Sequence, residues 1–343
     1  MIKKLGYGIV LILLAYLGYH FKSVVYGVQQ GAGQVEVLWN AQEISELMID
    51  PDFPDSTKEK FQFIATIKFF AESRLGLTKT QNYTSFYDQN GQPILWVVTA
   101  SPEFEIKAHE WKFPIAGGFP YKGFFDKERA KKEQQKFEKL GYDTELDEVN
   151  AWSTLGWFRD PILSSMLQRG SGRLADLIIH ESTHATLYVK DNVSFNENLA
   201  SFVGKIGAEL FLKEHYGDSS AEFLSYKLKL ERSKIYKDYM RSEITTLNEM
   251  YQNLDTTLAI EEKRALKKKR INEIKEGLLR INYFTDSTKA RARINSFEFN
   301  NAYFSGFNTY SKTLPQFNQL LEEEFSGDLK KMIASFKEKY ESL

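Results

Sequence analysis

The sequence of 343 residues contains no cysteine. This absence excludes disulfide bonds, thiolate zinc sites, iron–sulfur clusters, cysteine nucleophiles and acyl attachment at a cysteine. It does not indicate a compartment, because a chain without cysteine is stable in either redox environment. The chain also has no excess charge of one sign, since 46 Asp+Glu balance 45 Lys+Arg. Nucleic-acid-binding proteins usually carry a basic surface, so we expect no nucleic-acid partner.

Histidine is scarce, yet two of the five histidines stand in the pattern His180-Glu181-Ser182-Thr183-His184. On an α-helix, residues four apart lie on one face, so His180 and His184 can present two imidazole nitrogens to one metal ion. Glu181 lies too far around the helix to coordinate the ion and is placed to act as a catalytic base. Such a pattern also arises by accident on helix surfaces. Here it follows the apolar segment 174–179, where unligated imidazoles would need other partners, which favours a metal site.

A catalytic zinc ion needs a third protein ligand and keeps its fourth position for water. No third histidine follows at a short interval, and Glu197 is the best candidate. The loop around residues 190–192 would reverse the chain, and the small residues Ala200, Ser201 and Gly204 would let the next helix approach closely. Glu197 could instead only cap or solvate the start of that helix. His215 and Glu209 are weaker candidates.

Further polar residues flank the predicted ligands. Asp176 precedes His180 by one turn and could orient its other ring nitrogen, and Asn196 stands beside Glu197 as a second supporting residue. Tyr188 follows His184 by one turn and could donate a hydrogen bond to a developing oxyanion. A purely structural role remains the alternative for each of them. Glu103 could bind the free amine of a substrate or could be an ordinary surface carboxylate.

The N-terminus carries Lys3 and Lys4 before an apolar run over residues 5–19, which residues 24–28 could extend. This pattern is typical of an uncleaved signal anchor over residues 1–28. A cleaved signal peptide and a buried core helix are the alternatives. The positive N-terminal side would remain cytoplasmic, which predicts a single-pass protein of the bacterial inner membrane with its body facing the periplasm.

The pattern along the chain predicts an α+β fold that is predominantly helical, with a small β-sheet. Residues 216–290 contain a charged stretch, 220–282, that we interpret as a helical hairpin. Its run Lys267-Lys268-Lys269-Arg270 is typical of a solvated helix face. Extended segments are expected at residues 94–98, 103–106, 110–113 and 142–146, and helices at 40–76, 125–140, 172–188 and 196–215. We expect four regions: an anchor (1–28), a catalytic domain (29–215), the hairpin (216–290) and a C-terminal segment completing the catalytic domain (291–343).

Several stretches occur together and in order, and with the His-Glu-x-x-His pattern they resemble the bacterial "putative aminopeptidase" family, which is membrane- or lipid-anchored. The resemblance covers most of residues 26–210 and, more thinly, residues 296–320. The stretches that carry it are Gly31-Ala32-Gly33-Gln34, Ser101-Pro102-Glu103-Phe104, Phe113-Pro114-Ile115-Ala116-Gly117-Gly118, Pro120-Tyr121-Lys122-Gly123-Phe124-Phe125, Ser153-Thr154-Leu155-Gly156-Trp157-Phe158, Asp160-Pro161, His180 to Val189, and Phe195-Asn196-Glu197.

The resemblance implies a zincin-like catalytic domain in which His180, His184 and Glu197 hold one Zn²⁺ ion and Glu181 is the base. The expected function is hydrolysis of a peptide substrate by a membrane-anchored zinc metallopeptidase, and the family name suggests an aminopeptidase. One alternative is a membrane-tethered binding or assembly factor that recruits an envelope protein through residues 220–282 and has a structural or vestigial metal site. Another is metal-dependent hydrolysis of a different substrate.

Overall fold

The computed structural model describes residues 20–113, 117–149, 159–190, 192–281, 283, 287–309 and 314–340. Helices dominate this part of the chain and the strands are short, which confirms the predominantly helical α+β fold. The N-terminal half carries α2 (Phe21–Trp39), β1 (Gln42–Glu43), α3 (Ile44–Ile49), α4 (Asp55–Ser73), β2 (Ser85–Tyr87), β3 (Leu95–Pro102), β4 (Trp111–Phe113), β5 (Gly117–Phe119), β6 (Lys122–Phe124), α5 (Lys127–Glu138), β7 (Tyr142–Val149) and β8 (Ile162–Leu163).

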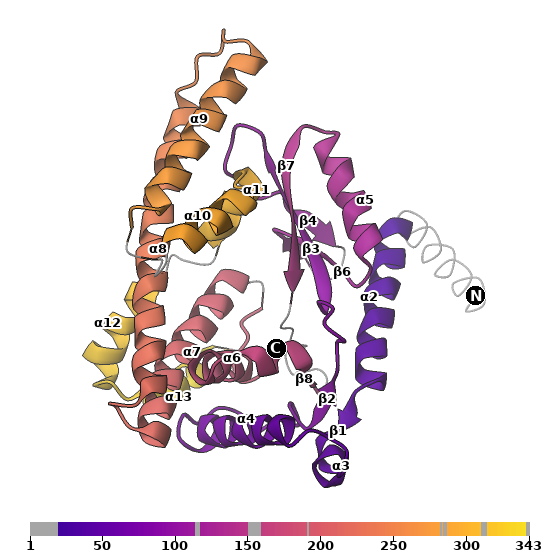
Figure 1. Ribbon diagram of the computed structural model, residues 1–343, viewed down its shortest axis with the longest axis vertical. Coiled ribbons are helices and arrows are strands. Elements are labelled where there is room, and N and C mark those ends of the chain that lie inside the picture. The colour runs from indigo at the N-terminus through magenta and orange to yellow at the C-terminus, as the bar shows by residue number, and fades with distance from the viewer. Residues whose placement is uncertain are drawn as a thin grey trace, which may run out of the picture.

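In the C-terminal half, the regular elements of the described residues are all helices. After the 3₁₀ turn η1 (Ser164–Gln168) come α6 (Ser171–His184), α7 (Val193–Tyr216), α8 (Ala221–Gln252), α9 (Ile260–Leu278), α10 (Ser287–Ser296), α11 (Asn301–Thr309), α12 (Leu314–Phe325) and α13 (Leu329–Lys339). Residues 220–282, interpreted as a helical hairpin, contain α8 and α9, which stand side by side in Figure 1.

The strands form small sheets rather than one continuous sheet. In the largest, β3 is the central strand and pairs antiparallel with β6 and with β7. Helix α5 packs against one face, and α11 packs on the opposite side of β3 and β7 (Figure 1). The extended segment expected at residues 103–106 is wrong, because the chain turns there. The Ser101 side chain bonds the Glu105 carbonyl and the Lys107 amide, which closes that turn.

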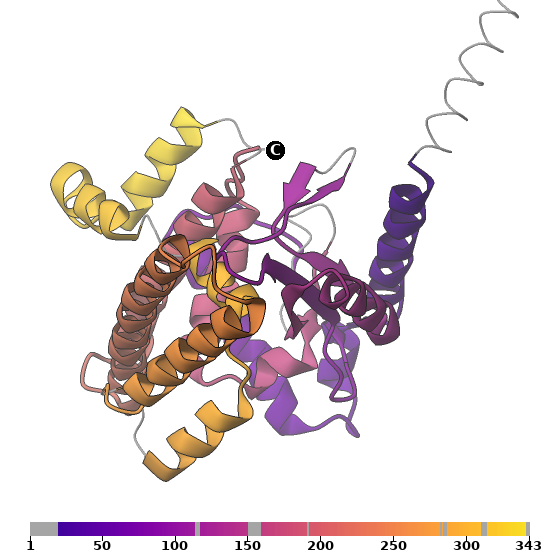
Figure 2. The same ribbon diagram turned by 90° about the horizontal axis from the view of Figure 1, so that it is seen from above.

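The main hydrophobic core lies around α4, α6 and α7. Ile64 and Ile67 of α4 meet Ile178 and Ile179 of α6, and all four are fully buried. Their spacing along each helix brings them to one face, and burying such side chains contributes roughly 1.5–3 kcal/mol each. Figure 2 shows the C-terminal helices α12 and α13 on the outer side of this assembly, where they contact α7. The helix that carries the histidine motif is therefore held rigidly from several sides.

Helix α8 joins two cores. Near its start, Tyr226 packs against Gly172 of α6, and its later residues Met240, Ile244 and Leu247 belong to a second core with α9 and α11. The charged hairpin thus has a packed inner face.

The expectation of a solvated face is wrong at both ends of the run Lys267-Lys268-Lys269-Arg270. Lys267 is buried and its ammonium donates to the Asp143 carboxylate at 2.6 Å and to the Glu103 carbonyl at 2.9 Å. Arg270 pairs with Glu243 across the hairpin. The sequence pattern did not reveal that these cations face β7 and α8 rather than water.

The predicted anchor is only partly covered by the structure. Residues 1–19 lie outside the described residues, and α2 continues past residue 28 to Trp39. Among the helices that are described, none combines the length and apolar character needed to cross a membrane. The anchor and the periplasmic location therefore stay predictions.

Candidate metal centre

The two histidines and the glutamate come from consecutive helices. His180 and His184 lie one turn apart on the last turns of α6, which ends at His184 itself. Glu197 lies in the second turn of α7, after the chain has reversed through residues 185–192. Helices α6 and α7 form the most extensive helix–helix contact among the described elements. This packing brings the three side chains together.

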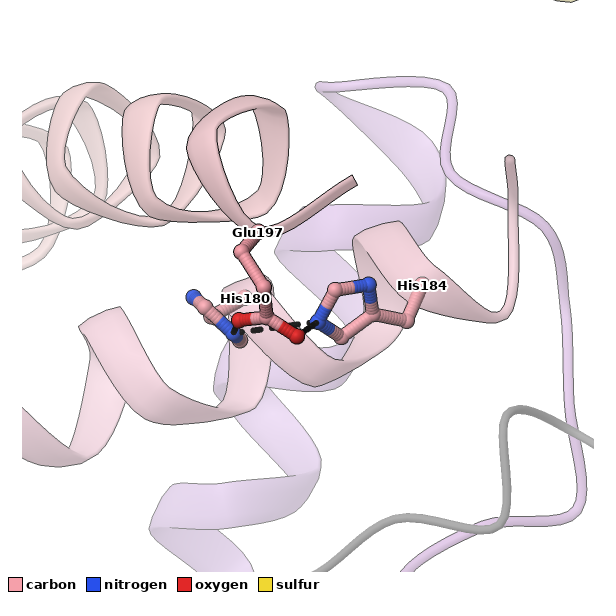
Figure 3. A group of neighbouring side chains, drawn as sticks. All are labelled: His180, His184 and Glu197. Carbon is pink, nitrogen blue, oxygen red and sulfur yellow. Dashed lines mark hydrogen bonds and ion pairs between the residues drawn. The ribbon is translucent and has the colours of Figure 1, made fainter. Parts of the chain in front are cut away.

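The three potential ligand groups form a compact triangle. The distances are 3.2 Å between the Nε2 atoms of His180 and His184, 3.4 Å from His184 Nε2 to Glu197 Oε1, and 3.6 Å from His180 Nε2 to Glu197 Oε2. Figure 3 shows the two imidazoles and the carboxylate pointing toward one another. These atoms all lie within 4.8 Å of one another, and the group could hold a metal ion.

The donor chemistry and the spacing both fit a tetrahedrally coordinated metal ion. With metal–ligand bonds of about 2.0–2.1 Å, two ligand atoms of a tetrahedral site lie about 3.3 Å apart. The exposed fractions of the side chains are 4% for His184, 20% for His180 and 27% for Glu197, so the group opens to solvent on one side. The predicted ligands thus meet at one point that small molecules can reach.

The three side chains also strongly influence one another's charge. Burial alone would raise the pKa of Glu197, but the hydrogen bonds and charges of His180 and His184 outweigh it and lower that pKa to about 2. Burial alone would lower the pKa of His180, but Glu197, Glu181 and Asp176 raise it. Glu197 is therefore ionised throughout the neutral range, as a metal ligand must be.

Asp176 lies one turn before His180, as expected, but no hydrogen bond joins the two side chains among the described atoms. Its carboxylate instead packs against the backbone of α7 at Gly204, where an added Cβ would lie 2.7 Å from Oδ1. Burial raises the pKa of Asp176, and the Tyr226 hydroxyl, Lys205 and His180 oppose this rise. The Tyr226 hydroxyl is buried near this carboxylate and makes no hydrogen bond with the described residues.

Asn196 fixes the connection between the two helices. Its side chain accepts a hydrogen bond from the Val189 amide and donates one to the Val189 carbonyl, both at 2.8 Å, and it is 1% exposed. This pair of bonds closes the loop so that Glu197, the next residue, faces the end of α6. The supporting role expected for Asn196 thus has a specific structural basis.

Tyr188 lies beside both a histidine and the glutamate. Its ring meets the His184 ring edge-on at 5.8 Å. Burial raises the pKa of the Tyr188 hydroxyl, and the Glu197 carboxylate raises it further. A hydrogen bond with the Asn196 side chain opposes this rise, and the phenol is protonated at neutral pH beside the three-residue group.

Two tyrosines near the site were not anticipated. Burial and the charge of Glu197 raise the pKa of Tyr121, which precedes β6. Tyr83 is partly buried, and burial and then Glu181 raise its pKa well above the usual value. The signals available in the sequence were Pro120-Tyr121-Lys122 and Asp160-Pro161, since the Tyr83 amide donates to the Asp160 carbonyl at 2.7 Å. These stretches carry the family resemblance and converge here from distant parts of the chain.

The weaker candidates lie elsewhere. His215 stacks on Phe211 with ring centroids 5.2 Å apart, and neither His215 nor Glu209 joins the three-residue group. Glu103 is held by Arg264 through two hydrogen bonds of 2.7 and 3.2 Å, so its carboxylate is not available to a substrate amine. The stretch Ser153 to Phe158 lies outside the described residues.

The fold and the site define a mostly helical α+β protein with a two-histidine, one-carboxylate group that could hold a metal ion. The chain belongs to the family described as "Putative aminopeptidase", whose family model matches residues 25–342. The match runs through the hairpin 216–290, farther than the resemblance seen in the sequence. No curated protein and no solved structure matches the chain.

Proposed function

We propose that the protein is a zinc-dependent peptidase with a zincin-like centre, in which His180, His184 and Glu197 hold one Zn²⁺ ion. The observation that supports this most strongly is the ligand triangle, whose edges of 3.2, 3.4 and 3.6 Å fit a tetrahedral zinc site. Membership of a family described as "Putative aminopeptidase" supports a peptide as the substrate.

The donor set favours zinc over harder cations. Two imidazoles and one carboxylate with a fourth position open are typical of catalytic zinc, whereas Mg²⁺ and Ca²⁺ prefer oxygen ligands. The same donors also bind Fe(II) in oxygenases. Metal analysis of the purified protein therefore belongs to the test, and stoichiometric iron without zinc would contradict the proposal.

A bound Zn²⁺ supplies a Lewis acid, which lowers the pKa of water and polarises the scissile carbonyl. The Glu181 carboxylate accepts the proton of the attacking water and passes it to the nitrogen of the leaving amine. The hydroxyls of Tyr188 and Tyr121 both lie near Glu197, and we assign them as donors to the carbonyl oxygen as it gains negative charge. The Asn196 side chain holds the backbone of Val189, the neighbour of Tyr188, through two hydrogen bonds.

The decisive variant is Glu181→Gln, which preserves the size of the side chain and removes the base. We expect kcat for peptide hydrolysis to fall by about 10²–10⁴-fold, while zinc content stays at one ion per chain. His180→Ala should instead lose the zinc together with the activity. Peptide-library digestion with mass spectrometry measures turnover and shows whether cleavage begins at the amino terminus.

A matched control is Glu214→Gln, which removes a carboxylate from the far end of α7, where Glu214 pairs with Arg74 in an exposed ion pair. This variant should keep both zinc and activity. Undiminished turnover in Glu181→Gln would refute the catalytic scheme.

A further inference from the structure

The guanidinium of Arg169, which follows η1 and precedes α6, has no partner within the described residues. Its side chain is half-buried, and its Nε atom is fully buried without a hydrogen bond. Within the described part of the chain, Arg169 makes neither an ion pair nor a side-chain hydrogen bond. An arginine stays charged at any physiological pH, so burying it unpaired costs free energy that a ligand would recover.

Arg169 lies within electrostatic range of two carboxylates of α6, Asp176 and Glu181. Burial lowers its pKa, Arg173 lowers it further, and Asp176 and Glu181 oppose this. Asp176 and Glu181 flank His180 along α6, so the guanidinium lies beside the ligand helix and close to the proposed catalytic base. Yet neither carboxylate comes within ion-pair distance.

Two more cations near Asp176 also lack partners. Lys205 of α7 and Lys237 of α8 are largely buried, and neither makes an ion pair or a side-chain hydrogen bond with any described residue. Burial lowers the pKa of Lys237 to about 8, and the charges of Lys205 and Arg241 contribute. Burial likewise lowers the pKa of Lys205, and Asp176 opposes this.

Charge near Asp176 is therefore unbalanced. Arg169, Lys205 and Lys237 all interact electrostatically with this one carboxylate. The Asp176 carboxylate lies against the α7 backbone at Gly204 and forms an ion pair with none of the three cations. Arg169, Lys205 and Lys237 thus carry positive charge that no ion pair within the described residues compensates.

We propose that this region is a subsite for a carboxylate of the substrate, with the Arg169 guanidinium as its ligand and Lys205 and Lys237 supplying additional positive potential. The inference rests on the proposed peptidase function and narrows its substrate class to peptides that carry a carboxylate near the scissile bond. A guanidinium binds a carboxylate through two parallel hydrogen bonds, which an ammonium cannot do. The carboxylate is either the C-terminus of a short peptide or an acidic side chain.

The test measures equilibrium binding by calorimetry to the zinc-loaded full chain carrying Glu181→Gln, which prevents turnover. The probes are Ala-Phe, Ala-Phe amide and Ala-Glu amide. At least one probe with a carboxylate should bind roughly 10- to 100-fold more tightly than Ala-Phe amide. Preference for Ala-Phe identifies the C-terminus, and preference for Ala-Glu amide identifies an acidic side chain. No preference for either overturns the proposal.

Adding Arg169→Gln should abolish the preference without weakening Ala-Phe amide, and Arg169→Lys should retain only part of it. The control Arg173→Gln removes an exposed cation four residues farther on and should change the preference by less than about twofold. A preference that survives Arg169→Gln would assign the carboxylate to the zinc ion and overturn the proposal. An equal loss for Ala-Phe amide, or an equal effect of Arg173→Gln, would also overturn it.

The outcome is separable from the proposed function. If carboxylate binding depends on Arg169 but the wild type hydrolyses no peptide, the subsite is supported and the peptidase function is refuted. If the wild type hydrolyses peptides without any carboxylate preference, the peptidase function is supported and the subsite is refuted. Thermal unfolding of each variant confirms that the compared proteins are folded.

Discussion

Gly204 is the residue at which α7 comes closest to the ligand helix. A Cβ at this position would lie 2.7 Å from Asp176 Oδ1, 2.9 Å from the Asp176 carbonyl oxygen and 3.1 Å from the His180 Cβ. Backbone atoms and a Cβ cannot rotate away, so a methyl group here forces α6 and α7 apart. The backbone of Gly204 is ordinary helix, so its φ angle does not require glycine. The close contact with α6 is what requires it.

We therefore predict that Gly204→Ala lowers the free energy of unfolding by about 1–3 kcal/mol and weakens zinc binding. The shift of α7 would widen the ligand triangle. Urea unfolding and competition with a chromogenic chelator measure the two effects. Gly306→Ala is the control, because nothing lies within 4 Å of the Cβ it would add to α11. It should be neutral or stabilising. Unchanged zinc affinity in Gly204→Ala would show that the helices can separate without disturbing the ligands.

At the scale of elements, the α8–α9 hairpin is fastened to the sheet by a small polar network. Asp143 of β7 accepts hydrogen bonds from the Lys267 ammonium and from the Asn301 amide at the start of α11. The Asn301 side chain in turn donates to the carbonyls of Pro102 and Glu103. These contacts join β3, β7, α9 and α11 at one corner.

Lys267→Met should lower the free energy of unfolding by about 2–3 kcal/mol, since it leaves a largely buried carboxylate with one partner fewer. Chemical denaturation followed by circular dichroism measures this change. Lys268→Met is the matched control, because its side chain is exposed and makes no ion pair within the described part of the chain. An equal effect of the two substitutions would mean that the hairpin is held by its apolar face alone.

At the scale of the whole molecule, stability should depend on pH through Glu145 of β7. Burial raises the pKa of Glu145 to about 8, and the charge of Asp147 adds to the rise. The folded protein then holds a proton that the unfolded chain has released, in the window from about pH 4.5 to 8. The free energy of unfolding consequently falls as pH rises through this window and becomes constant above it.

Glu145→Gln should flatten that fall, because the amide stays neutral at every pH. Urea unfolding at half-unit steps between pH 5 and 8.5 measures the slope for both proteins. Glu148→Gln, an exposed substitution on the same strand, should keep the wild-type slope. A slope that persists in Glu145→Gln would assign the proton to another group.

Only some residues of the site could be predicted from the sequence. His180 and His184 were predictable because a spacing of four residues has a fixed meaning on a helix, and Glu197 because the reversal between two helices is short. Tyr83, Tyr121 and Arg169 were not, since each reaches the site from a connection between elements. Their places depend on packing that no local pattern encodes. The solvated position expected for Lys267 is wrong for the same reason.

The three ligands of the proposed centre all lie between residues 180 and 197, on two helices joined by a closed loop. Their contacts are therefore local in the sequence, and closing so short an interval costs little entropy. During synthesis, this pair of helices leaves the ribosome well before the hairpin and the C-terminal helices. We expect a metal ion to be captured by the nascent pair and to stabilise it, which would make metal supply a determinant of folding yield as well as of activity.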